Sequence, residues 1–466
     1  MNPQNSPGPA FEVKPQNSPV SAISRFRWVI CALLFFSTTV NYLDRQVISY
    51  LKEFFCTPVA GGGFGWTNSQ FSYLTAFFTG VYATATIFAG WFIDKIGTKL
   101  GLAVSLVTWS FFGILNAFVG SVIWLHVAVR SLFAVGEAGN FPASIKTVAE
   151  WFPKRERALA TAIFNAGSNG GAMVAAIFVP TCIGWFGAQQ GWKWAFIITG
   201  AGGLLWLVFW FWFYDPPNKH RKLSKAEYDY IHIDDETQTD AQNGDKAAKV
   251  SWLRLFKYRQ LWAFFAGKFM TDGIWWFYLF WLPDYLIKQF GMKPEDVRMP
   301  TFIIYGVSIV GSIYGSSIPL TLIKRGMAVY RARMITMFII ALFPLVVLST
   351  QYFGNQGHFG QWAEVLAIAT ICVGCTAHQA WSANLFTTVS DMFPKKSVAS
   401  VTGIGTMAGG VGGVIIQLVQ GKLRDSFIQT PQTAYLIMFI ICAVSYLIAW
   451  IIMKALVPRH KPITDL

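Results

Sequence analysis

The sequence predicts an all-α membrane protein in which twelve transmembrane helices form two pseudo-symmetric bundles of six. The first observation is composition: 54% of the 466 residues are hydrophobic and 13% are charged, whereas soluble domains carry about 25% charged residues. Apolar runs recur along the chain, each near the ~20 residues that a helix needs to cross a bilayer. They lack the two-residue alternation of barrel strands. Helices satisfy the backbone within lipid, so a helical bundle is expected.

The apolar runs define the order of the predicted elements. They fall at 28–50, 70–93, 100–119, 123–149, 157–180, 194–214, 260–286, 300–322, 334–350, 362–390, 398–421 and 433–455. The predicted organisation is a disordered N-terminal tail (1–27), a first bundle (28–214), a polar linker (215–257), a second bundle (258–455) and a C-terminal tail (456–466).

The distribution of positive charge predicts the orientation. Segments that are cytoplasmic if both termini are cytoplasmic carry 26 of the 37 Lys and Arg residues, against 7 in the opposite loops. Cytoplasmic loops carry the excess of positive charge, so we expect both termini in the cytoplasm. This pattern explains the net charge of +14 better than nucleic-acid binding does. Cys372 and Cys375 are expected to be buried apolar residues, and no metal site is expected.

An internal repeat supports the two bundles. Residues 151–155 (WFPKR) return as residues 392–396 (MFPKK), a shift of 241 positions, and further matches follow at the same shift. The fourth and fifth helices therefore correspond to the tenth and eleventh. Two parallel halves of this kind are one of the known plans of membrane transporters.

The loop between the second and third helices carries a spaced motif, GWFIDKIGTK. Gly90 is expected to let the second helix approach a neighbour closely. Asp94 is expected to meet a helix N-terminus, with Lys95 facing the cytoplasm. The motif predicts a latch that stabilises one of two conformations, and the alternative is an ordinary basic loop.

Ionisable residues within the predicted spans are functional candidates because they are costly there. In the first helix, Arg45 offers a planar fork suited to a carboxylate, and Asp44 can bind a proton. The alternative is a structural ion pair. In the fourth helix, Glu137 lies near mid-membrane and can carry a proton. Arg130, seven residues earlier on a similar face, is either its partner or a structural tie.

Polar residues in three later helices complete the candidate site. Lys268 and Asp272 lie on one face of the seventh helix, as a structural pair or as a pair that opens during a transport cycle. The remaining candidates line the pathway: Asn165 and Ser168 in the fifth helix, Trp276 in the seventh, and His378, Trp381 and Asn384 in the tenth.

These residues resemble those of the anion:cation symporter family of the major facilitator superfamily, and within it the hexuronate transporters. The similar strings are NYLDR, GWFIDKIG, GEAGNFP, AEWFPKRERALATAIFNAGSNGGA, WWFYLFWLPDYL and HQAWSANLFTTVSDMFP, and the resemblance extends over about residues 25–455. It implies proton-coupled uptake of organic anions. It places the proton-coupling carboxylates at Asp44 and Glu137, the substrate-binding arginine at Arg45, and lining aromatic residues at Tyr82 and Trp381. Ser168 stands where relatives can have Gln, so recognition of the sugar chain is expected to differ there.

The sequence thus predicts a proton symporter that imports hexuronates such as galacturonate or glucuronate across a bacterial inner membrane. Its expected partners are the anionic sugar, the proton and the bilayer, with no cofactor, no nucleic acid and a monomeric state. Two alternatives remain: transport of another sugar acid or organic anion (galactonate, glucarate), and a membrane sensor that binds without transport. The sequence shows no nucleophile–base set or metal cluster that would predict an enzyme.

Overall fold

A computed structural model describes residues 25–233, 252–459, 461 and 463, and the regular structure in this part of the chain is helical. The first group of helices is α1 (Phe26–Cys56), α2 (Asn68–Ile96), α3 (Thr98–Leu115), α4 (Ile123–Glu137), α5 (Asn140–Trp151), α6 (Lys154–Phe186) and α7 (Ala188–Phe213). The second group is α10 (Arg259–Phe290), α11 (Arg298–Lys324), α12 (Val329–Leu342), α15 (Ala363–Met392), α16 (Lys395–Ser426) and α17 (Pro431–Leu456). Short helices connect them: α8 (Lys225–Ile231), α9 (Trp252–Leu255), α13 (Thr350–Phe353) and α14 (Gln356–Phe359).

Ten helical segments in the described chain are long and apolar enough to cross a membrane. The two predicted spans outside this set are 123–149, which the structure divides into α4 and α5, and 260–286, which lies in the 32-residue α10. Membrane crossing at these two positions stays a prediction.

The break between α4 and α5 follows from the local sequence. Pro142 is the third residue of α5 and has no N–H to donate to the carbonyl of Ala138, so a continuous helix would lose that hydrogen bond. The same segment packs tightly on α3. A Cβ at Gly136 would lie 2.5 Å from the backbone N of Trp109, and one at Gly139 would lie 2.0 Å from Ser105 Oγ. The glycines thus bring the end of α4 against α3.

The repeated sequence at residues 151–155 and 392–396 forms the same turn twice. Pro153 precedes α6 with φ −62° and ψ 152°, and Pro394 precedes α16 with φ −63° and ψ 147°. Each following helix packs closely on the first long helix of its group. A Cβ at Gly171 would lie 2.4 Å from Thr39 O in α1, and one at Gly412, 241 positions later, would lie 2.1 Å from Phe269 O in α10.

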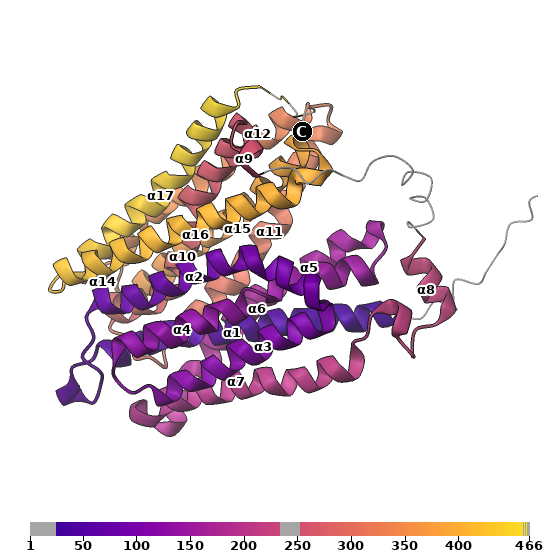
Figure 1. The fold of residues 1–466 in the computed structure, drawn as a ribbon. Helices are drawn as coiled ribbons and strands as arrows, with labels where there is room; N and C mark the ends of the chain where they lie inside the picture. Colours follow the sequence, from indigo (N-terminus) through magenta and orange to yellow (C-terminus); the bar gives the residue numbers. More distant parts are fainter. Residues whose placement is uncertain (1–24, 234–251, 460, 462, 464–466) are drawn as a thin grey trace, which may run out of the picture.

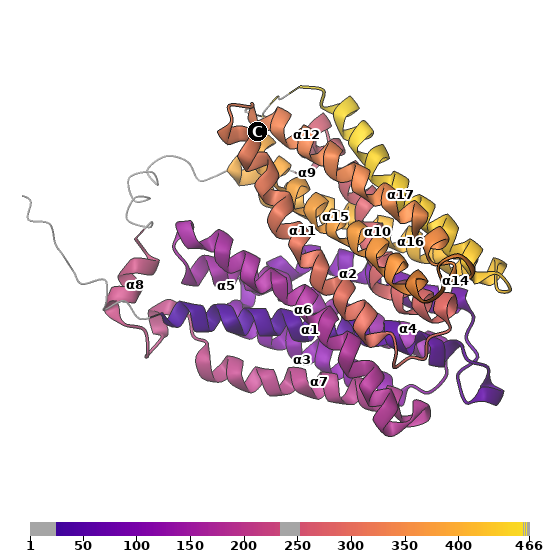
Figure 2. The same cartoon turned by 180° about the vertical axis from the view of Figure 1, so that it is seen from behind.

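The two groups of helices form two bundles that diverge toward one end (Figures 1 and 2). We call this the terminal end: α1 begins there at Phe26 and α17 ends there at Leu456. At the opposite, closed end, polar contacts join the bundles. Lys52 Nζ lies 2.7 Å from Asp284 Oδ1, and Lys288 Nζ lies 2.7 Å from Glu53 Oε2.

Parts of the predicted linker and tails pack against the bundles. In α8, Glu227 is fully buried and its Oε1 lies 3.0 Å from Arg27 Nη1 at the start of α1. The backbone N of Ile463 donates to Met392 O at 2.9 Å. Specific contacts thus hold the described parts of the linker and the C-terminal tail in place. Most of the N-terminal tail and residues 234–251 of the linker lie outside the described residues.

Candidate functional site

Four buried charges from α1 and α4 form the centre of the candidate site, and we call them the charge cluster: Asp44, Arg45, Arg130 and Glu137. Arg45 Nε lies 3.0 Å from Glu137 Oε2, and their side chains are 2% and 0% exposed. Arg130 Nη2 donates to the backbone carbonyl of Arg45 at 3.1 Å, and Arg130 interacts electrostatically with both carboxylates. The partner of Glu137 is therefore Arg45, and Arg130 is held to the backbone of α1.

Several polar atoms of the charge cluster have no hydrogen-bond partner among the described residues. They are both carboxylate oxygens of Asp44, Oε1 of Glu137, Nη2 of Arg45, and Nε and Nη1 of Arg130. A buried polar atom without a partner carries an uncompensated desolvation cost. Such a set is suited to binding sites, where a ligand, a proton or water supplies the missing partners.

Aromatic rings from both bundles surround the guanidinium of Arg45. Its Cζ lies 4.4 Å from the ring centroids of Tyr42 and Tyr82, and 5.4 Å from that of Trp276. Phe78 lies 5.6 Å away. Cation–π attraction is strengthened by desolvation, so these rings stabilise the cation. Because Trp276 belongs to α10, Arg45 lies at the junction of the bundles.

A residue that the sequence did not single out, Gln417 in α16, supports this junction. Its Oε1 accepts hydrogen bonds from Thr75 Oγ1 in α2 at 3.0 Å and from Trp281 Nε1 at 2.6 Å. Its Nε2 donates to the carbonyl of Trp276 at 3.0 Å. The fully buried amide thereby fixes α10 next to α2. No sequence signal marked it, because one Gln in an apolar helix has no characteristic spacing.

The pair predicted on α10, Lys268 and Asp272, lies farther from Arg45 than Trp276 along the same helix. Lys268 Nζ lies 2.5 Å from Asp272 Oδ2, and Lys268 also contacts the ring of Phe386 at 4.4 Å. Lys268, Asp272 and Trp276 follow at four-residue intervals and so lie along one face of the helix. A Cβ at Gly409 would lie 2.2 Å from Asp272 Oδ2, so α16 confines the pair.

The candidates on α15 occupy three different settings. His378 is buried, its Nδ1 lies 2.8 Å from the hydroxyl of Tyr446, and its ring stacks on Trp275 at 5.1 Å. Trp381 is buried with its Nε1 unpartnered among the described residues. Asn384 donates to the carbonyl of Gly315 at 2.8 Å, a tie to α11.

One candidate on α6, Asn165, lies on the side that faces the second bundle. Asn169 accepts a hydrogen bond from Gln379 of α15 at 3.5 Å, and Asn165 lies one turn away on the same face. Asn165 is exposed. The hydroxyl of Ser168 donates to the carbonyl of Asn165 at 2.7 Å, so in this conformation it bonds within its own helix.

The predicted latch takes a different form in this conformation. Asp94 Oδ1 lies 2.8 Å from Lys146 Nζ of α5, within one bundle, and Lys95 Nζ lies 5.2 Å from the ring centroid of Trp91. The close helix contact expected at Gly90 is not made in this conformation, because within the described chain a Cβ there would meet no atom within 4 Å, and it stays a prediction for the other conformation. The bundles diverge at this end, so no helix approaches. Gly97 has the structural role instead, with φ 88° between α2 and α3.

A separate group of buried charges, which the sequence did not single out, lies at the closed end. Asp284 is 2% exposed, and its carboxylate pairs with Lys52 of α1 at 2.7 Å and with Arg424 of α16 at 3.3 Å. It also accepts a hydrogen bond from Tyr435. An acidic residue after Pro283 in an apolar run was a usable signal. Its partners, however, are distant in sequence.

Comparisons with known proteins agree with this architecture. The Major Facilitator Superfamily model matches residues 34–417. The hexuronate transporter of Escherichia coli strain K12 is 30% identical over 418 residues, which cover 90% of this chain and 92% of that protein. The D-galactonate transporter of Escherichia coli O6:H1 is 25% identical over 438 residues, covering 92% and 97%.

A solved structure has the same fold. A bacterial homologue of the human lysosomal transporter Spinster, in an inward-facing and occupied conformation, aligns with a TM-score of 0.69 at 15% identity, over 93% of this chain and 97% of that chain. The chain is thus a multi-pass membrane transporter rather than an enzyme, and it belongs to the Major Facilitator Superfamily, where its relatives are transporters of the anion:cation symporter type.

Proposed function

We propose that this protein is a proton-coupled symporter that imports hexuronates, such as galacturonate or glucuronate, by alternating access. The observation that carries the proposal is Arg45: a buried guanidinium with an unpartnered Nη2, in aromatic surroundings built by both bundles. A planar fork of donors matches a carboxylate. The hexuronate transporter relative supports a sugar acid as the bearer of that carboxylate.

The charge balance of the cluster supplies a reason for coupling. Arg45 and Arg130 are formally balanced by Asp44 and Glu137 when both carboxylates are ionised. A substrate carboxylate that approaches Arg45 adds a third negative charge in a desolvated place, which is costly. Protonation of Glu137 or Asp44 restores the balance. Substrate and proton should therefore bind with positive linkage.

Glu137 also competes directly with the substrate. Its Oε2 holds Arg45 Nε at 3.0 Å, and a neutral carboxyl group would hold the guanidinium less strongly. A proton on Glu137 would release Arg45 toward the substrate. In the reverse step, departure of the substrate would let Arg45 pair with Glu137 again, which favours release of the proton.

Groups of both bundles would contact the sugar. Trp276 and Trp381 offer aromatic surfaces, Asn165, Ser168 and Asn384 offer polar groups, and His378 is held by Tyr446. The Lys268–Asp272 pair begins one turn of α10 from Trp276, so opening of this pair would add a cation on the sugar side of the site.

The positive-inside pattern places the terminal end in the cytoplasm of a bacterial inner membrane. The closed end would then face outward, and the structure would represent an inward-facing state. Import requires the Asp284 contacts to open and the terminal end to close, with Asp94 in the latch. Each bundle would move largely as a rigid body around the site. A single chain contains both bundles, so a monomer would suffice.

The test is uptake of radiolabelled galacturonate by proteoliposomes that contain the purified protein. An imposed inward proton gradient should drive accumulation above the external concentration, and a protonophore should abolish it. Equal uptake with and without the gradient would exclude proton coupling. Failure to accumulate any sugar acid would exclude the transport function.

Two alternatives are separated in the same liposomes. Counterflow with galactonate, glucarate and other organic anions ranks the substrates, and the D-galactonate transporter relative makes galactonate the first comparison. A membrane sensor would bind galacturonate in a detergent-solution assay but show no counterflow.

A further inference from the structure

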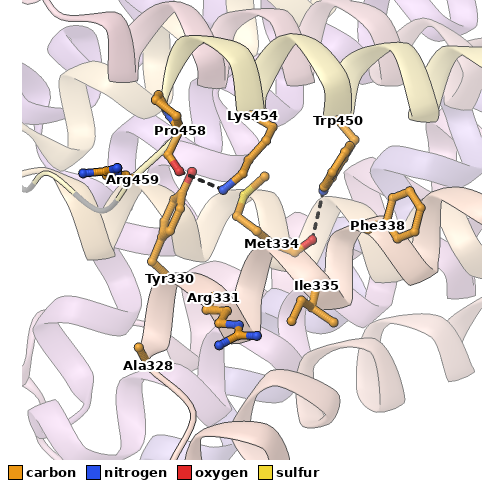
Figure 3. A pocket seen from close by; sticks show the side chains of 10 residues that line it. All are labelled: Ala328, Tyr330, Arg331, Met334, Ile335, Phe338, Trp450, Lys454, Pro458 and Arg459. Carbon is orange, nitrogen blue, oxygen red and sulfur yellow. Dashed lines mark hydrogen bonds between the residues drawn. The ribbon is translucent and has the colours of Figure 1, made fainter.

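A groove of about 600 Å³ lies on the outer side of the second bundle, away from the charge cluster. It lies between the first turns of α12 and the last turns of α17, at the terminal end (Figure 3). We call it the α12–α17 groove. Its volume lies within the ~300–1,000 Å³ range of small-molecule sites. Neither the charge cluster nor the proposed mechanism uses any of its residues.

The groove changes character along the helix axes. Its deeper part is apolar, with Met334, Ile335, Phe338 and Trp450. Trp450 Nε1 donates to the carbonyl of Met334 at 2.9 Å, and its ring lies 4.8 Å from that of Phe338. These contacts join the two helices and leave a fixed apolar floor. Exposed apolar side chains continue along the same helices, including Ile339 on α12 and Ile451 on α17.

The mouth of the groove is basic. Arg331, Lys454 and Arg459 line it, and no acidic residue is among the lining residues. Arg331 and Arg459 are exposed and have no ion pair among the described residues. Their neighbour Arg333, by contrast, pairs with Asp391. The mouth therefore has three formal positive charges with no acidic partner among the described residues.

Local contacts hold this basic mouth in shape. Lys454 Nζ donates to the carbonyl of Pro458 at 2.8 Å and lies 5.1 Å from the ring centroid of Tyr330. The hydroxyl of Tyr330 donates to the carbonyl of Val457. The turn after α17 is thereby fixed over the start of α12. The mouth is a formed structure rather than a set of independent surface side chains.

We propose that the α12–α17 groove binds an anionic phospholipid. The apolar floor would take part of an acyl chain, and Arg331, Lys454 and Arg459 would take the phosphate group. The order of the two parts matches a lipid in a bilayer, with acyl chains toward the membrane centre and the headgroup at the terminal end. Basic pockets between helices at the membrane surface bind acidic headgroups in this way. The proposal requires membrane insertion but not the proposed substrate.

The test uses full-length protein in detergent and native mass spectrometry of bound lipid. Dioleoyl phosphatidylglycerol and dioleoyl phosphatidylcholine have the same chains and differ in charge. Three basic residues face the phosphate group at the mouth, so the wild-type protein should prefer phosphatidylglycerol by roughly tenfold or more. No preference in the wild-type protein would overturn the proposal without any variant.

Two double variants locate the site. Arg331→Gln with Arg459→Gln should remove most of the preference, and leaves Lys454 and its structural contacts in place. Lys324→Gln with Arg325→Gln removes the same charge from exposed positions at the same end, outside the groove, and should keep the preference. Equal loss in both variants would show a general effect of surface charge and would contradict a defined site.

A third arm separates the lipid from a soluble anion. Inorganic phosphate at millimolar concentration should not displace phosphatidylglycerol, because it cannot use the apolar floor. Displacement by phosphate, or equal retention of a short-chain phosphatidylglycerol, would reassign the groove to a soluble phosphate ligand.

Discussion

The side chain of Arg45 has three different environments at once. Its Nε is bonded to Glu137, its face lies against Tyr42 and Tyr82, and its Nη2 has no partner in the described chain. The planar shape of guanidinium makes these three uses compatible, since edge and face are used separately. An ammonium group has neither the fork nor the flat face.

Arg45→Lys is therefore expected to lose substrate affinity by about a hundredfold, within the range for truncating one partner of a buried hydrogen-bonded charge pair. The measurement is galacturonate binding to purified protein by calorimetry. Arg333→Lys is the control, because Arg333 pairs with Asp391 in the second bundle, and it should bind normally. Near-normal affinity in Arg45→Lys would remove Arg45 from the substrate site.

Glu137→Gln imitates the protonated carboxyl group permanently. Because it leaves Arg45 available to substrate, binding and counterflow should persist, while accumulation driven by a proton gradient should fall to the level of equilibration. Both are measured in the same liposomes. Glu364→Gln, at the start of α15 on the closed end, should behave like wild type. If Glu137→Gln still concentrates substrate, coupling belongs to Asp44 or Asp272.

At the scale of elements, conformational control is divided between the two ends of the helices. Asp284 on α10 binds Lys52 of α1 and Arg424 of α16, and so ties the bundles at the closed end. Asp94, in the last turn of α2, has a side chain that is 73% exposed and bonded within its own bundle. The Asp284 contacts are therefore made in this conformation. Asp94 makes no contact between the bundles here and remains available for one at the terminal end.

Asp284→Asn is expected to shift the protein toward the opposite conformation. Removing one partner of a buried ion pair costs about 3–5 kcal/mol. Here that cost destabilises the conformation in which the bundles meet at the closed end. The reporter is Thr75→Cys in a cysteine-free background, since Thr75 is 1% exposed and lies at the bundle junction. Its labelling rate from the closed side should rise at least tenfold. Asp215→Asn, which breaks a pair within one bundle, should leave the rate unchanged.

Asp94→Asn should slow turnover while substrate affinity stays within about twofold, because an exposed ion pair contributes only about 0–1 kcal/mol and Asp94 lies at the terminal end of α2. Binding and uptake rates are compared on the same preparation. A large loss of affinity with normal turnover would contradict the latch. Asp229→Asn, on the exposed side of α8, provides a matched charge control.

At the scale of the whole molecule, the proposed orientation rests on charge placement. Loops on the cytoplasmic side of a membrane protein carry an excess of Lys and Arg. Here 26 of the 37 Lys and Arg residues lie in the segments predicted to be cytoplasmic. Single cysteines in a cysteine-free background test this. Val59→Cys, 73% exposed at the closed end, should react with an impermeant maleimide in intact cells. Lys324→Cys should react only after permeabilisation, and the reverse pattern would invert the proposed direction of transport.

The sequence by itself determined the helical membrane class, the order of the elements and the 241-residue repeat, because hydropathy and turn residues act over short stretches of chain. Pro153 and Pro394 start α6 and α16 with the same geometry, as their shared motif predicted. The sequence also singled out each member of the charge cluster, since ionisable residues stand out in apolar helices.

Only the tertiary structure decided the pairings. Arg45 bonds Glu137, 92 positions away, rather than the adjacent Asp44. Gln417 joins α16 to α2 and α10, and Asp284 closes one end through residues more than 100 positions distant on either side. The physical reason is that periodicity shows which face of a helix is polar, but not which helix lies opposite. That choice depends on close packing at positions such as Gly171 and Gly412, and on the conformation in which the two bundles meet.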